Sequence, residues 1–262
     1  MTASQGGRDR NDPARNDPNV FFFEGFEDEG YAGRFTDVSH PQNRELVSGD
    51  AAFDGEHALR FAIRGEDHYG GSLSFRFSKA GMPEPEALYG RYYLRLGEDW
   101  DPGSGGKLPG PAGTYNRAGW GGRKVDGTDG WSARMGFKTS KTRQGETQVY
   151  FYTYHVDMSG QYGSNFLWDI ENRGSLRNGR WYCIETYVKM NTPGQNDGVL
   201  RGWVDGNLAM EKTDLRFRDV PDLKIETFWM NLYYGGTWSA PHEMDVYFDN
   251  VALSTGPIGP VE

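Results

Sequence analysis

Apolar and aromatic residues recur at every second position in many short segments of this chain. In Leu73-Ser-Phe-Arg-Phe77, for example, Leu73, Phe75 and Phe77 share one face of an extended strand. Glycine, proline and aspartate separate such segments at short intervals, as expected for turns. The pattern predicts strands over residues 57–64, 71–77, 89–96, 132–138, 148–155, 181–190, 198–204, 228–234 and 245–253.

Helical periodicity is weak throughout. Residues 208–216 have some helical character, but Gly206-Asn207 favours a hairpin turn before them. Many short strands without long helices are typical of a β-sandwich or jelly roll. We find no linker between residues 20 and 255, so we expect a single domain there. Residues 1–19 contain almost no apolar side chain and should form a disordered tail, and residues 256–262 a C-terminal tail.

Composition supports this fold class. Aromatic residues make up 15% of the 262 positions and glycine fills 37 of them, which suits aromatic strands joined by glycine turns. No apolar run is long enough for a membrane-spanning helix. Cys183 is the only cysteine, which excludes an intrachain disulfide, and we expect it to be a buried apolar residue. The chain starts without a signal-peptide pattern, and we expect a secreted protein whose signal has been removed.

Charge is distributed unevenly. The whole chain carries a formal charge of -9, yet residues 107–143 hold eight basic residues against two acidic ones, a local charge of +6. A positive region on a negative protein suits an anionic ligand better than it suits nucleic acid. The next strand places Tyr150, Tyr152 and Tyr154 on one face. Cations that hold a carboxylate, beside phenols that move a proton, indicate chemistry on an acidic polymer.

Several motifs together resemble a known family. They are Gly105-Gly-Lys-Leu-Pro-Gly110, the preceding strand 89–96 with Trp100, Trp131-Ser-Ala-Arg134, the tyrosine strand, and the segments 181–191, 228–236 and 247–251. In this order they resemble the jelly-roll polysaccharide lyases that cleave alginate and glucuronan. The resemblance covers residues 20–255. It implies an all-β, concanavalin A-like jelly-roll sandwich with an open concave groove, and an acidic polysaccharide as the partner.

The resemblance also implies a set of site residues. In that family the motif lysine, the Ser-x-Arg strand and a Tyr-x-Tyr pair line the groove and serve catalysis. Carried over, these are Lys107, Ser132, Arg134 and two of the three tyrosines. We prefer Tyr152 and Tyr154 for catalysis and assign Tyr150 and Ser132 to substrate binding.

These residue types suit β-elimination, which removes the proton on C5 of a uronate and expels the oxygen on C4. Lysine and arginine neutralise the carboxylate beside C5, and such electrostatic preorganisation is usually the largest catalytic contribution. A tyrosine normally has a pKa of about 10, and we expect nearby cations to lower it so that a phenol can exchange protons. The bond cleavage requires no cofactor.

Further candidates come from neighbouring segments. His155 follows the tyrosines and is a candidate base. Substrate contacts are expected from Trp120 and Arg123, in an insertion at 114–129 that departs from the alginate-lyase pattern, and from Asn231 and Tyr233. Trp131, Trp229 and Trp238 are further candidates for stacking on sugars. The resemblance implies a structural calcium ion in some relatives, and Glu24 and Asp249 offer the hard oxygen ligands that calcium prefers.

The sequence therefore predicts a monomeric, secreted polysaccharide lyase that attacks a uronate polymer within its chain, and no nucleic-acid or membrane partner. Two other classes stay open. A non-catalytic carbohydrate-binding protein on the same fold would need mainly aromatic residues. A glycoside hydrolase would need two suitably spaced carboxylates.

Overall fold

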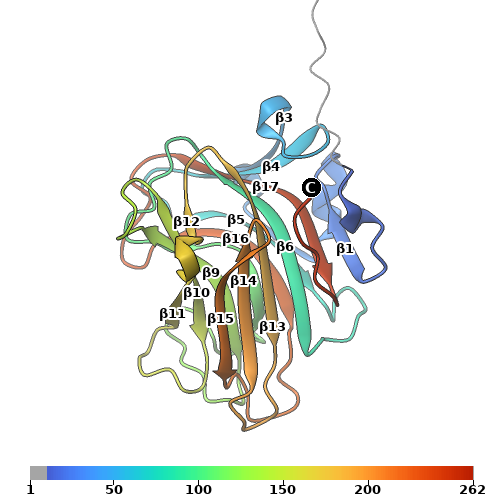
Figure 1. Cartoon of the computed structure of the whole chain (residues 1–262), viewed down its shortest axis with the longest axis vertical. Helices are drawn as coiled ribbons and strands as arrows, with labels where there is room; N and C mark the ends of the chain where they lie inside the picture. Colours follow the sequence, from blue (N-terminus) through green and yellow to red (C-terminus); the bar gives the residue numbers. More distant parts are fainter. Residues whose placement is uncertain (1–10, 262) are drawn as a thin grey trace, which may run out of the picture.

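Two antiparallel β-sheets packed face to face make up the protein (Figure 1). The computed structural model describes residues 11–261. The first sheet has eight strands in the order β15-β14-β13-β6-β17-β4-β3, with β1 beside β17. Their bounds are β1 Val20–Glu24, β3 Arg44–Ser48, β4 His57–Ile63, β6 Ala87–Leu96, β13 Trp181–Lys189, β14 Gly198–Val204, β15 Asn207–Leu215 and β17 Met244–Ser254.

The second sheet has nine strands in the order β11-β10-β9-β7-β16-β5-β2, with β12 beside β10 and β8 between β16 and β9. Their bounds are β2 Asp37–Ser39, β5 Tyr69–Arg76, β7 Gly106–Lys107, β8 Gly110–Gly113, β9 Trp131–Thr139, β10 Thr147–Tyr154, β11 Ser164–Leu167, β12 Ser175–Leu176 and β16 Thr227–Tyr234. Helical structure among the described residues is limited to five short 3₁₀ helices: η1 Pro13–Arg15, η2 Glu29–Arg34, η3 Pro41–Asn43, η4 Gly49–Ala51 and η5 Ile170–Asn172.

The strand predictions agree with this structure. Each predicted strand is present, with ends within two residues of those expected, and the all-β jelly-roll sandwich is confirmed. Residues 207–215 form a strand rather than a helix, after a turn in which Asp205 (φ 49°) and Gly206 (φ 74°) are left-handed. A two-residue turn with both φ angles positive matches the twist of a hairpin, which explains the choice. No helix in residues 11–261 is long and apolar enough to cross a bilayer.

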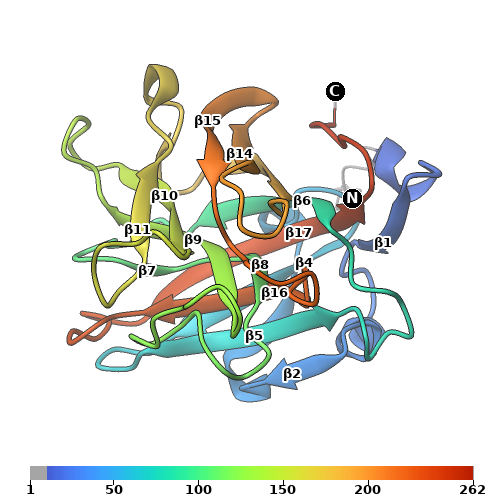
Figure 2. The same cartoon turned by 90° about the horizontal axis from the view of Figure 1, so that it is seen from below.

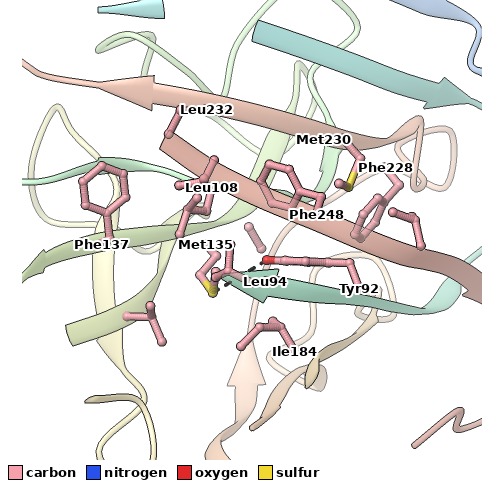
Figure 3. Close-up of a cluster of buried hydrophobic side chains, with 14 of the residues drawn as sticks. Tyr92, Leu94, Leu108, Met135, Phe137, Ile184, Phe228, Met230, Leu232 and Phe248 are labelled. Atoms are coloured by element: carbon pink, nitrogen blue, oxygen red, sulfur yellow. Dashed lines mark hydrogen bonds between the residues drawn. The ribbon is translucent and has the colours of Figure 1, made fainter. Parts of the chain in front are cut away.

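The core lies between the sheets and is formed by alternate residues of each strand. Figure 3 shows the centre of this layer, with side chains that include Tyr92, Leu94, Met135, Phe137, Phe228, Met230 and Phe248. Tyr92 is fully buried, and its hydroxyl lies 3.8 Å from the sulfur of Met135. Because side chains alternate along a strand, the intervening residues of β9, β10 and β16 face away from this core. That outer face carries the basic and tyrosine side chains.

The described residues near both ends of the chain are more ordered than expected. Residues 1–10 lie outside the described part, but residues 11–19 are not a loose tail. Asp12 is fully buried, and its carboxylate accepts hydrogen bonds from Arg91 and Asn250. At the other end, the backbone N–H groups of Ile258 and Gly259 donate to Glu185. Composition alone suggested a tail, because it cannot show that Asp12 is buried and pairs with the buried Arg91.

Candidate active site

The outer face of the second sheet brings the basic residues and the tyrosine strand together. Strands β9 and β10 pair with Arg134 opposite Tyr152 and Gly136 opposite Tyr150. Lys107 pairs with Gly136 from the other side, on β7. Directly paired residues and residues two apart share a face, so Lys107, Arg134 and the tyrosines all lie on this surface, as the sequence led us to expect.

Glycines in the Gly-Gly-Lys-Leu-Pro-Gly motif allow this close assembly. A Cβ on Gly106 would come within 2.2 Å of the carbonyl oxygen of Tyr233, and a Cβ on Gly110 within 2.6 Å of the Cα of Arg134. Any other residue would therefore push β7 and β8 away from their neighbours. The close packing of β7 and β8 therefore requires the glycines of this motif, and this packing places Lys107 beside Arg134.

Arg134 is a buried cation without an acidic partner. Its side chain is 7% exposed, and its guanidinium carbon lies 4.2 Å from the ring centre of Trp229. Within residues 11–261 it forms no ion pair, and its Nε has no hydrogen-bond partner. Burial lowers the pKa of Arg134 to about 10. The group therefore stays charged at neutral pH while lacking the anion that a buried charge normally requires.

Lys107 lies beside this arginine. Its ammonium nitrogen is 3.7 Å from the ring centre of Tyr152, a cation–π contact. Burial, followed by the positive charge of Arg134, lowers the pKa of Lys107 to about 7. Lys107 can therefore gain or lose a proton near neutral pH, which is what a general acid or base requires.

The pKa of Tyr152 shifts in the direction opposite to our expectation. We expected neighbouring cations to lower it. Instead, burial raises the pKa of Tyr152, and a hydrogen bond with Tyr154 raises it further. Removal of the phenolate from water is the largest cause of the shift, and Lys107, with its own pKa near 7, offers little compensating charge. Tyr152 is therefore a neutral phenol that can donate a proton.

Tyr154 is covered by the insertion. Its side chain is fully buried and packs with Ala118, Val125 and Met158. The backbone N–H of Gly122 donates to its hydroxyl at 2.9 Å. Tyr154 is therefore covered in the unliganded protein, and its ring centre lies 5.5 Å from that of Tyr152.

The insertion also determines what several other candidates do. Ser132 donates its hydroxyl hydrogen to the carbonyl of Gly119 at 2.6 Å, so it holds the insertion in place. Trp120 and Arg123 contact each other there, with the guanidinium carbon 4.2 Å from the ring. Trp131 is fully buried in the core and is not available to sugars.

Tyr150 and His155 occupy different surroundings. The ring of Tyr150 lies over Gly136, where a Cβ would come within 2.5 Å of it, and burial raises the pKa of Tyr150 to about 12. His155 lies beyond the end of β10, with its Nε2 3.0 Å from the hydroxyl of Ser164 and its ring 5.7 Å from Phe166. Phe166 packs against the core. The structure therefore does not bring His155 to the group formed by Tyr152 and Lys107.

Strand β16 completes the surface. Tyr233 pairs with Lys107. Asn231 is buried, and its side-chain oxygen has no partner among the described residues, so it can accept a hydrogen bond from a ligand. Trp238 is partly exposed and donates its indole hydrogen to Gly105. Tyr69, which pairs with Tyr233, was missed in the sequence because it lies outside every motif.

The two expected calcium ligands are already engaged. Glu24 pairs with Arg34 and accepts the backbone N–H of Phe26. Asp249 accepts three backbone N–H groups, from Phe53, Asp54 and Asn250, and burial raises its pKa. Residues 11–261 contain no group of three or more histidine, cysteine or acidic side chains suited to a metal ion. A calcium ion at Glu24 would have to displace Arg34.

Comparison with solved structures supports the fold. The alginate lyase Aly36B, bound to an alginate tetrasaccharide, is 20% identical, with a TM-score of 0.72 over 92% of this chain and 96% of that one. The alginate lyase of Aplysia kurodai is 18% identical, with a TM-score of 0.68 over 90% and 99%. The endo-β-1,4-glucuronan lyase of Trichoderma reesei is 17% identical, with a TM-score of 0.60 over 90% and 96%. At these identities the similarity establishes the fold.

The enzyme class comes from the sequence. No curated protein matches this chain significantly. The family model described as polysaccharide lyase 14, however, matches residues 61–251, which span Lys107, Arg134 and the tyrosine strand. The predicted class, a polysaccharide lyase, is confirmed. This chain belongs to the polysaccharide lyase 14 family.

Proposed function

We propose that this lyase cleaves a uronate polymer of the alginate or glucuronan type by β-elimination at Arg134, Lys107 and Tyr152. The observation that carries the proposal is Arg134, a buried cation that lacks an acidic partner among residues 11–261. A uronate carboxylate supplies the missing anion, and a guanidinium can hold it with two parallel hydrogen bonds. The similar solved structures of alginate and glucuronan lyases support the same class of substrate.

The three groups divide the reaction between them. Arg134 binds the carboxylate and stabilises the negative charge that develops when the C5 proton leaves. Lys107, with its pKa near 7, accepts that proton as a neutral amine. Tyr152, which keeps its own proton, donates it to the C4 oxygen as the C4–O bond breaks and the C4–C5 double bond forms. Tyr154 is a positioning residue, since its ring contacts that of Tyr152.

Other features remain proposals of the same kind. Asn231 and Tyr233 contact the sugar units, and Trp120 and Arg123 form the wall beside them. We expect a secreted monomer that attacks within the polymer, which size-exclusion chromatography and the product length distribution test. A structural calcium ion at Glu24 and Asp249 stays a prediction. A rise in melting temperature on adding calcium supports it, and an unchanged value counts against it.

The direct test measures the ultraviolet absorbance of the conjugated double bond on glucuronan, alginate, pectate and glycosaminoglycans. On the best substrate we expect Tyr152→Phe to lower kcat by about 10²-fold, the scale of general acid catalysis. The value of kcat/KM should rise with pH through about 7 as Lys107 loses its proton. Tyr247→Phe, which removes a phenol hydroxyl on β17 of the first sheet, serves as the control.

The outcomes separate the possibilities. Binding of uronate polymers without any elimination product would favour a carbohydrate-binding protein, and release of reducing ends without the double bond would favour a hydrolase. Full activity of Tyr152→Phe would remove the donor role from this residue. If kcat/KM does not rise with pH near 7, Lys107 is not the base.

A further inference from the structure

One row of residues crosses the second sheet at right angles to its strands. Tyr150 pairs with Gly136, Gly136 with Lys107, Lys107 with Tyr233, and Tyr233 with Tyr69. The row therefore runs over β10, β9, β7, β16 and β5, of which β5 and β16 lie side by side in Figure 2. Neighbouring strands are about 4.8 Å apart, so its four steps cover about 19 Å. Such a length exceeds what a single sugar unit can occupy.

The far end of this row is a platform of two rings. Tyr69 is 52% exposed, and its ring centre lies 5.1 Å from that of Tyr233. The ring centre of His40 lies 5.5 Å from that of Tyr69, with the two ring planes only 6° apart. An exposed tyrosine that stacks nearly parallel to a histidine offers a flat surface rather than an isolated side chain.

Local structure fixes this platform before any ligand arrives. His40 has a left-handed backbone (φ 51°), uncommon for a residue other than glycine, at the start of η3. Its Nδ1 lies 3.0 Å from the hydroxyl of Ser39, on β2. The side chain of Asn43, at the end of η3, donates to the carbonyl of Tyr69 at 2.8 Å. The segment 39–43 thus joins the two rings through their backbones.

We infer that Tyr69 and His40 form a sugar-stacking subsite of the polymer groove. This inference rests on the proposed function and adds to it the course of the substrate, which runs across the strands from Tyr152 towards β2. The subsite lies two strand spacings, about 10 Å, from Lys107. It therefore holds a neighbour of the sugar unit that is cleaved. The apolar C–H face of that sugar ring packs on Tyr69, while Arg134 holds the carboxylate at the reacting unit.

The test compares Tyr69→Ala with Tyr69→Phe on the polymer and on a series of oligosaccharides of defined length. Tyr69→Ala should raise KM for the polymer about fivefold to tenfold, as truncation of an interface aromatic does, with kcat nearly unchanged. Tyr69→Phe keeps the ring and should behave as the wild type. The defect should emerge only above a certain substrate length. Tyr247→Ala, on the outer face of the first sheet, removes an aromatic ring away from the groove and should leave KM unchanged.

Other outcomes overturn the inference. An unchanged KM in Tyr69→Ala does so, and so does a defect of equal size on the shortest cleavable substrate. If Tyr69→Ala fails to fold, His40→Ala removes the second ring alone and should also raise KM, and no change there overturns the subsite. If the wild type cleaves no uronate polymer, the proposed function fails separately. In that case affinity electrophoresis still tests the subsite. Binding of the polymer by the wild type and its loss in Tyr69→Ala would support the subsite.

Discussion

Arg91 and Arg134 are both buried in the middle of a sheet, but they differ in what surrounds their charge. Arg91, 1% exposed, pairs with the carboxylate of Asp12 and donates to the carbonyl of Asn250. Arg134 has neither kind of partner within the described residues and lies over the ring of Trp229. The protein neutralises the first charge itself, and we propose that the carboxylate of the substrate neutralises the second.

On the proposed function, this difference distinguishes a structural arginine from a binding arginine. A buried charge is costly unless it is paired and hydrogen-bonded. At Arg91 an internal carboxylate offsets that cost. At Arg134 the cost persists in the free enzyme and lowers the pKa of the guanidinium to about 10. Binding of a carboxylate would remove this cost, so we expect the removal to contribute to the affinity for substrate.

The largest effect is expected from breaking the internal pair. Asp12→Ala leaves Arg91 buried without its carboxylate and should lower the free energy of unfolding by about 3–5 kcal/mol. Activity per folded molecule should stay the same, because Asp12 lies on the first sheet's side of the molecule. Urea unfolding measures the change, with the exposed Asp50→Ala as control. A loss below about 1 kcal/mol would show that Arg91 is not held in this way.

Removing Arg134, the unpaired arginine, should have the opposite effects, a loss of activity without a loss of stability. Arg134→Met keeps much of the side-chain volume and should lower kcat/KM by about 10²–10³, the range observed when an oxyanion-stabilising donor is removed. The free energy of unfolding should be unchanged or higher, since an uncompensated charge has been removed. Arg134→Lys should recover activity only in part, because an ammonium cannot make the bidentate contact. Unfolding at lower urea with normal kinetics would assign Arg134 a structural role instead.

A smaller effect should distinguish Lys107 from an ordinary surface lysine. Its pKa is about 7 in the folded protein, whereas the unfolded chain holds this proton up to about pH 10. The free energy of unfolding therefore falls as the pH decreases from about 10 to 7, because the unfolded chain binds this proton first. Below about pH 7 the loss of stability is constant. Lys107→Met should raise stability by about 1–2 kcal/mol at pH 6 and by almost nothing at pH 10. Melting temperatures at both pH values, with Lys141→Met as control, measure this, and a gain independent of pH would refute it.

Local features were readable from the sequence, because strand alternation and glycine motifs act over a few residues. Strand β10 and its three tyrosines follow from alternation alone. The Gly-Gly-Lys-Leu-Pro-Gly motif located Lys107, and the steric reason is the close approach at Gly106 and Gly110. These features depend on neighbours in the chain or on one pairing partner.

Features that depend on distant contacts were not readable. The sequence does not show that the insertion at 114–129 folds over Tyr154. The pKa of Tyr152 depends on a balance between burial and charge that only the assembled site defines. Tyr69 joins the site only through the register of β5 with β16. Asp12 lies in a polar segment whose composition gives no hint of its partner, Arg91.

The position of β6 has a consequence for synthesis of the protein. This strand lies between β13 and β17, and both follow it in the chain, with β17 beginning at Met244. While the ribosome is still translating the intervening segment, β6 carries two open edges, which are templates for unwanted pairing. The centre of the first sheet can close only after β17 has emerged. The nascent protein should therefore depend on chaperones that cover strand edges until that point.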